Sequence, residues 1–233
     1  MVDLMKVSRG YLVVVLVWVW MFFGAIVTEL IIGFVKGWRI DEIFERLYIE
    51  PYLASYVEIV SVGGLPLLIT LLYGDSPSTY GLRKEGLIKS LVLSLLLVVV
   101  YALALIALKG PPRLSHVCFN LDYPYNIWYA LLGVFAYGPL EVFFVIWLIV
   151  NTDLALKSDR LLSPGLVITT VIFGLSHLLS APKAGYTNTI SVTVTFLILG
   201  LIFKYTKNSI GPMIAWTILN SQVRYLIVGC LCL

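Results

Sequence analysis

Seven long apolar stretches, separated by short polar segments, follow one another along the chain. They lie at about residues 11–35, 53–73, 87–108, 127–150, 164–181, 189–204 and 209–230. A membrane-spanning helix needs about 20 mainly apolar residues, so the pattern predicts an all-α transmembrane bundle of about seven spans, within a range of six to eight. In the second stretch, Gly63-Gly64 and Pro66 are expected to kink or split the helix.

Composition supports this interpretation. Hydrophobic residues make up 60% of the 233 residues and charged residues only 12%, and the mean hydropathy is +0.98. These values exclude an ordinary soluble domain. The first apolar stretch is longer than the about 7–15 residues of a signal-peptide core, so we expect it to remain as an anchor. We predict one domain over residues 1–233, in contact with membrane lipids.

Lysine and arginine are distributed unevenly among the predicted loops. If the chain has seven spans, nine lysines and arginines, Lys204 among them, lie on the side of the N-terminus, and six lie on the opposite side. Because cytoplasmic loops carry the excess, we expect a multi-pass protein with a cytoplasmic N-terminus. The basic residues are scattered rather than gathered in one stripe, so the net charge of +3 gives no indication of nucleic-acid binding.

Two polar connections have a pattern of their own. The charged loop at 36–51 suits a short interfacial helix, or a solvated connector. The segment at 74–90 begins with turn residues and then becomes basic and amphipathic, which favours an anchor at the membrane surface.

Three of the apolar stretches each carry one polar residue of a type that does chemistry. They are Glu141 in YGPLEVFFVIW, His177 in VIFGLSHLL and Asn220 in MIAWTILNSQ. A mid-helix Asp, Lys or Arg costs about 2.5–3.5 kcal/mol on insertion scales, so an ionisable residue at that depth is a functional candidate. Glu141 suits a general base, and the preceding Gly138-Pro139 can admit water. A protonated Glu bonded to a neighbouring helix is the alternative.

Helical spacing gives two of these residues an aromatic neighbour. His177 follows Phe173 by four residues and shares its helix face, where a neutral imidazole can hold a water or a metal. Asn220 follows Trp216 by four, and their N–H groups suit an oxyanion hole. The structural alternatives are a packed core histidine and ordinary hydrogen bonding between helices.

In this order and spacing, the motifs resemble those of the CAAX protease and bacteriocin-processing (CPBP) family, which includes the type II CAAX prenyl proteases. FGLSHLL matches the family's F-x-x-x-H motif. STYGLRKEG is similar to the family's Gly-Leu-basic entry to a span, and FLILGLIFKYTKNSIGPMIAWTILNS is similar to its glycine-bearing span, Asn-containing turn and final H-x-x-x-N helix. The resemblance covers a core of about residues 76–222.

The resemblance implies a helical-bundle endopeptidase working inside the membrane. By the family's motifs, Glu141 is the base, His177 is its partner on the water, and Asn220 is an oxyanion donor. Trp216 and Phe173 are candidates for the oxyanion hole or the substrate pocket. The implied substrate is a lipidated or membrane-associated peptide.

The chain departs from the family pattern at three positions. The family's first motif reads E-E-x-x-x-R, whereas here Glu141 alone is acidic, its twin falls on Leu140 or Val142, and the Arg position is apolar. The third-motif His is Trp216, which cannot bind a metal. A catalytic zinc site needs three protein ligands, so the ligand set looks incomplete. No metal ligand is assigned, and the cofactor is left open.

The leading prediction is therefore a divergent intramembrane endopeptidase that cuts near the membrane surface by Glu-activated water. A second hypothesis is a catalytically impaired family member that acts as a membrane binding or scaffold protein. A third is a small proton- or cation-coupled transporter, with Glu29, Glu58 and Glu141 as its ion sites.

Overall fold

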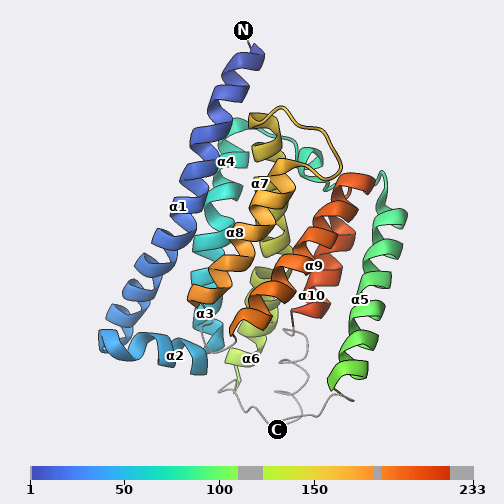
Figure 1. Ribbon diagram of the computed structural model, residues 1–233. Coiled ribbons are helices and arrows are strands. Elements are labelled where there is room, and N and C mark those ends of the chain that lie inside the picture. Colours follow the sequence, from blue (N-terminus) through green and yellow to red (C-terminus); the bar gives the residue numbers. More distant parts are fainter. Residues whose placement is uncertain (1, 110–122, 181–184, 221–233) are drawn as a thin grey trace.

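The computed structural model describes residues 2–109, 123–180 and 185–220. Every regular element in these ranges is helical (Figure 1). In chain order they are α1 (Val2–Lys36), η1 (Ile40–Glu42), α2 (Ile43–Ile49), α3 (Pro51–Glu58), η2 (Ile59–Gly64), α4 (Leu65–Tyr73), η3 (Pro77–Tyr80), α5 (Leu87–Lys109), α6 (Tyr125–Trp128), η4 (Tyr129–Gly133), η5 (Ala136–Leu140), α7 (Glu141–Ala155), α8 (Pro164–Ser180), α9 (Gly185–Thr206) and α10 (Ile210–Leu219).

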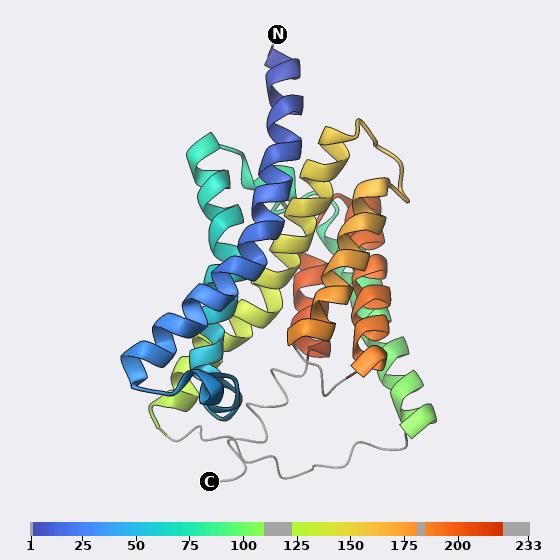
Figure 2. The same cartoon turned by 60° about the vertical axis from the view of Figure 1, so that its left-hand side comes forward.

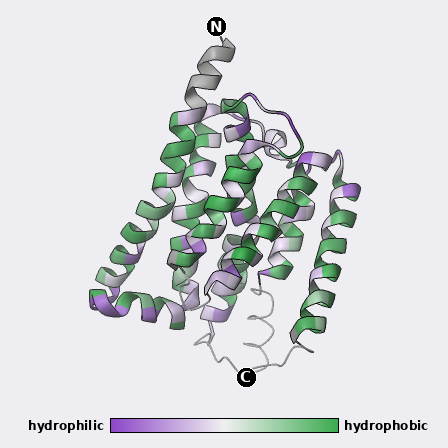
Figure 3. Cartoon of the chain, in the orientation of Figure 1, coloured by the Kyte–Doolittle hydropathy of each residue, from purple (hydrophilic) through white to green (hydrophobic). Residues whose placement is uncertain are grey.

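By length and composition, five helical stretches of the described chain can cross a membrane. They are Tyr11–Lys36, Pro51–Tyr73, Leu87–Leu108, Tyr125–Ala155 and Gly185–Thr206, and two shorter apolar helices, Pro164–Leu178 and Ile210–Leu219, lie among them. Apolar residues run along most of the length of the helices (Figure 3). The prediction of an all-α polytopic bundle is confirmed. Residues 221–230 of the last predicted span lie outside the described ranges.

Helix α7 forms the centre of the bundle. It packs against α1, α8, α9 and α10, and the side chains of residues 142–149 are all buried. Figures 1 and 2 show α1 and α5 on opposite flanks of this centre. Helix α5 turns a mostly apolar, exposed surface outward. The first residue of α7, Glu141, therefore lies deep in the protein.

Two of the spans change their helical winding next to a glutamate. The π-helical turn η2 directly follows Glu58, and the π-helical turn η5 directly precedes Glu141. Pro139 lies inside η5, and because proline has no N–H the hydrogen-bond ladder must change there. At Gly63-Gly64, where a kink or split was predicted, the structure has the π-helical turn η2. The helical stretch continues unbroken to Tyr73.

Both predicted surface segments are ordered. The loop at 36–51 contains the short helix α2, as predicted. The segment at 74–90 packs onto the turn between α9 and α10: the Asn208 amide donates to the backbone carbonyls of Arg83 at 2.5 Å and Glu85 at 3.2 Å. Gly86 has a φ of +72°, and a Cβ there would clash with the carbonyl of Thr206. The basic residues thus sit on a packed connector.

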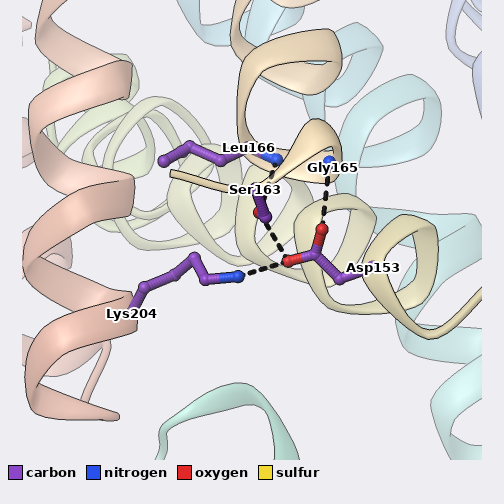
Figure 4. A network of polar contacts seen from close by, with 5 residues as sticks. All are labelled: Asp153, Ser163, Gly165, Leu166 and Lys204. Atoms are coloured by element: carbon purple, nitrogen blue, oxygen red, sulfur yellow. Dashed lines mark hydrogen bonds and ion pairs between the residues drawn. The ribbon is translucent and has the colours of Figure 1, made fainter. Parts of the chain in front are cut away.

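One buried ion pair joins α7, α8 and α9 (Figure 4). The Asp153 carboxylate accepts from Lys204 Nζ at 2.5 Å, from Ser163 Oγ at 2.7 Å and from the backbone N–H of Gly165 at 3.0 Å. Ser163 Oγ in turn accepts from the N–H of Leu166, so this serine caps α8. Lys204 therefore lies inside the protein, which corrects its assignment to the free loop cations. The orientation of the N-terminus stays a prediction.

Candidate functional site

The structure brings two of the predicted residues, Trp216 and Asn220, to the carboxylate of a third, Glu141. The side chain of Glu141 is only 4% exposed. Its Oε2 accepts from the indole Nε1 of Trp216 at 2.5 Å and from Nδ2 of Asn220 at 2.9 Å. The four-residue spacing on α10 predicts that both donors share a helix face, and that face meets the start of α7.

The donors of Trp216 and Asn220 are used within the protein. Nδ2 of Asn220 also donates to the backbone carbonyl of Tyr137 at 2.6 Å, and the indole of Trp216 has a single N–H. An oxyanion role would require a substrate oxygen to take one of these hydrogens from its present acceptor. In the arrangement observed, the two side chains orient the Glu141 carboxylate.

His177 is held by its own helix and faces a cavity. Its Nδ1 lies 2.9 Å from the carbonyl oxygen of Phe173; because a carbonyl only accepts, Nδ1 carries the hydrogen and Nε2 keeps its lone pair. Phe173 is a core residue that does not line this cavity. It is 2% exposed, and its ring meets that of His177 edge-on at 5.1 Å between centroids. Phe173 thus fixes the imidazole.

A cavity of about 180 Å³ lies between α5, α8, α9 and α10. Its lining residues are Tyr101, His177, Asn188, Ser191, Val192, Thr195, Trp216, Leu219 and Asn220. A water takes about 30 Å³ in the liquid, so the cavity has room for several waters and polar groups to bind them. Glu141 is not part of the lining. Trp216 and Asn220 contact both the cavity and Glu141, so they link the carboxylate to it.

A second carboxyl group accompanies Glu141. The side chain of Glu58, the last residue of α3, lies within hydrogen-bonding range of the Glu141 carboxyl. Tyr137 interacts electrostatically with both groups and with Glu29. The sequence carries a signal for Glu58, since it is an ionisable residue in an apolar span. That signal alone predicts an ion site of a transporter and gives no connection to Glu141. No motif connects positions 58 and 141.

The donor set does not fit a catalytic metal. Within the described residues, no group of three or more His, Cys, Asp or Glu side chains is placed to hold a metal ion. Of the site residues, His177 and Glu141 have side chains of the types that bind zinc. Their neighbour Trp216 cannot be a ligand, because the indole nitrogen is only a donor.

A bundle of apolar helices with this polar centre defines an integral, multi-pass membrane protein. Residues 123–222 match the family described as Type II CAAX prenyl endopeptidase Rce1-like. The match supports the assignment of the chain to the CPBP/CAAX protease family, which suggests a CAAX-type intramembrane protease. No curated protein and no solved structure gave a significant match.

The matched segment covers part of the predicted core and part of the site. It contains Glu141, His177, Trp216 and Asn220. It leaves out residues 76–122, which belong to the predicted core of about 76–222, and it leaves out Glu58, which lies before that core. It does not favour the transporter hypothesis. Glu58 therefore joins the site from a part of the chain that the family match does not cover.

Proposed function

We propose that the protein is an intramembrane endopeptidase that hydrolyses a peptide bond near the membrane surface with water activated by Glu141. One observation carries the proposal. The buried Glu141 carboxylate is held by Trp216 and Asn220, and both of these line the polar cavity that His177 also borders. Trp216 and Asn220 thus connect the base to the solvent space that the imidazole borders.

The chemistry needs a base whose charge is not neutralised by a cation. Trp216 and Asn220 are neutral donors, so they orient the carboxylate without an ion pair. In the proposed step, a water bound by His177 Nε2 loses a proton to Glu141 and its oxygen attacks the peptide carbonyl carbon. The C–N bond then breaks, and the leaving amine takes the proton from Glu141. One water is consumed for each bond cut.

The substrate we propose is a lipidated or membrane-associated peptide. The outer surface of the bundle is largely apolar, with exposed side chains on α1 and α5. A peptide with a lipid chain would partition into the bilayer beside such a surface. The hydroxyl and amide groups of the cavity wall, among them Asn188 and Ser191, would suit the hydrogen bonds of an extended peptide backbone.

The test is cleavage of a fluorogenic lipidated peptide by purified protein in detergent or proteoliposomes. We expect cleavage by the wild type, loss of cleavage in Glu141→Ala at unchanged expression, and a strong decrease in His177→Ala. Glu29→Gln serves as the matched control, since it removes another carboxyl group from an apolar span. Equal activity in Glu141→Ala and wild type would remove Glu141 from the chemistry.

A second candidate function is a membrane scaffold that kept the bundle and lost the chemistry. It is favoured by the engagement of the Trp216 and Asn220 donors with Glu141 and the Tyr137 carbonyl, because neither of these two side chains then offers a hydrogen to an oxyanion in the resting protein. This function predicts that partner binding persists in both Glu141→Ala and His177→Ala while no variant, and no wild-type protein, cleaves a peptide.

A further inference from the structure

We infer that Glu58 is a positioning residue of the Glu141 site: it holds a proton and donates it in a hydrogen bond to the Glu141 carboxylate. The inference rests on the proposed function, in which Glu141 is the base. Glu58 comes from α3, outside the matched segment 123–222. The chain would thereby build one acid–base pair from two spans that are 83 positions apart.

Close packing brings together the two turns beside which the carboxyl groups stand. Each stands at the junction of an α-helix with a π-helical turn, Glu58 before η2 and Glu141 after η5. A Cβ on Gly63 of η2 would clash with the side chain of Leu140, the neighbour of Glu141. A glycine is therefore needed where these turns meet. Local π-helical turns often occur at functional sites.

The immediate surroundings also favour a shared proton. Two carboxylates at hydrogen-bonding range in a low-dielectric interior cannot both stay ionised, so such a pair holds one proton. The ion pairs within the described ranges involve neither Glu58 nor Glu141. Tyr137 of η5 interacts with both carboxyl groups, and also with Tyr129 of η4 and Glu29 of α1. Trp216 of α10 and Asn220, which directly follows α10, donate to Glu141.

The location of the proton follows from the donors. Trp216 and Asn220 both donate to Oε2 of Glu141, and hydrogen bonds to the charged form of a carboxyl favour that form. Glu141 is therefore the ionised member, and Glu58 is the protonated one. An O–H of Glu58 that points at Glu141 would add a third donor and help to hold the base in its orientation.

The test compares two substitutions of Glu58 in the peptide-cleavage assay. Glu58→Met removes the donor, and we expect kcat to fall about 10–100-fold, the loss of one hydrogen bond to a charged group, with little change in KM. Glu58→Gln keeps an N–H donor at the same place, so its kcat should stay close to that of the wild type. Glu29→Gln is the matched control and should leave both constants unchanged.

Equal kcat in the Met variant, the Gln variant and the wild type would overturn the inference, as would an equal loss in both variants. If Glu141→Gln is inactive while those variants are equal, the proposed function survives and the role of Glu58 fails. A merely structural role of Glu58 would lower the amount of folded protein in both variants and leave kcat per folded molecule unchanged.

An infrared spectrum decides the matter without a substrate. The C=O band of a protonated carboxylic acid should disappear in Glu58→Gln, because the remaining Glu141 is ionised. It should persist, shifted, in Glu141→Gln and be retained in Glu29→Gln. An unchanged acid band in Glu58→Gln would overturn the inference. If no protein cleaves any peptide but this pattern holds, the proposed function fails and the proton on Glu58 stands.

Discussion

Two buried carboxylates of this protein differ in their partners although they are almost equally inaccessible. Asp153 is 7% exposed and Glu141 is 4% exposed. Asp153 faces the ammonium of Lys204, a hydroxyl and a backbone N–H, whereas Glu141 faces two neutral donors and a second carboxyl. A paired charge holds helices together, while a carboxylate without a cation remains able to take up a proton.

The largest expected effect comes from removing the cation at the Asp153 site. Lys204→Met leaves a buried carboxylate unpaired, so we expect the free energy of unfolding to fall by about 3–5 kcal/mol. Thermal unfolding in detergent measures this, and cleavage per folded molecule should be unchanged. The double variant Asp153→Leu/Lys204→Met is the control and should be more stable than the single one. A single variant as stable as the wild type would contradict the role of the pair.

At the Glu141 site, the next effect should appear in catalysis. Trp216→Phe removes the indole N–H that orients the base, and we expect kcat to fall about 10–100-fold. Trp147→Phe is a matched control, because Trp147 is also buried and its Nε1 donates to Thr70 Oγ1 at 3.1 Å, away from the cavity. If both variants lost activity to the same extent, orientation by Trp216 would not be the cause.

A smaller change at the Asp153 site should again affect stability alone. Ser163→Ala removes the cap of α8 and one donor to Asp153, so the free energy of unfolding should fall by about 0.5–2 kcal/mol. We expect an unchanged kcat and KM per folded molecule. A change in KM for this variant would show that the two sites are coupled.

The smallest expected effect lies at the wall of the cavity. Tyr101→Phe removes a hydroxyl that lies 3.0 Å from Ser191 Oγ, and the loss of one neutral hydrogen bond is about 0.5–1.5 kcal/mol. KM should change by less than about tenfold, with kcat unaffected. Kinetics over a range of substrate concentrations separates the two constants. A loss of kcat equal to that of Trp216→Phe would move Tyr101 into the catalytic machinery.

Much of the fold could be predicted because the length of an apolar stretch indicates a membrane-spanning helix directly. The approximate places of the described spans, the pairing of Phe173 with His177 and that of Trp216 with Asn220 follow from apolar length and four-residue spacing. The π-helical turns could not be predicted, since they depend on packing between spans, as at Gly63 and Leu140. Two of them, η4 and η5, lie within the fourth span, Tyr125–Ala155.

The partners of the charged residues were the part that sequence could not give. Glu58 meets Glu141, and Lys204 meets Asp153, only after distant helices pack together, and no local pattern encodes either contact. The sequence Ser163-Pro164 does carry the signature of a capped helix start, which could have drawn attention to the surroundings of Asp153. Nothing equivalent precedes Glu58.

The most direct test is cleavage per folded molecule in two conservative variants measured side by side. In Glu141→Gln we predict a loss of about 10²–10⁴-fold in kcat, with a folded fraction close to that of the wild type. In Asp153→Asn we predict a reduced folded fraction and a wild-type kcat for the molecules that remain folded. A wild-type kcat per folded molecule in Glu141→Gln would contradict the assignment of Glu141 as the base.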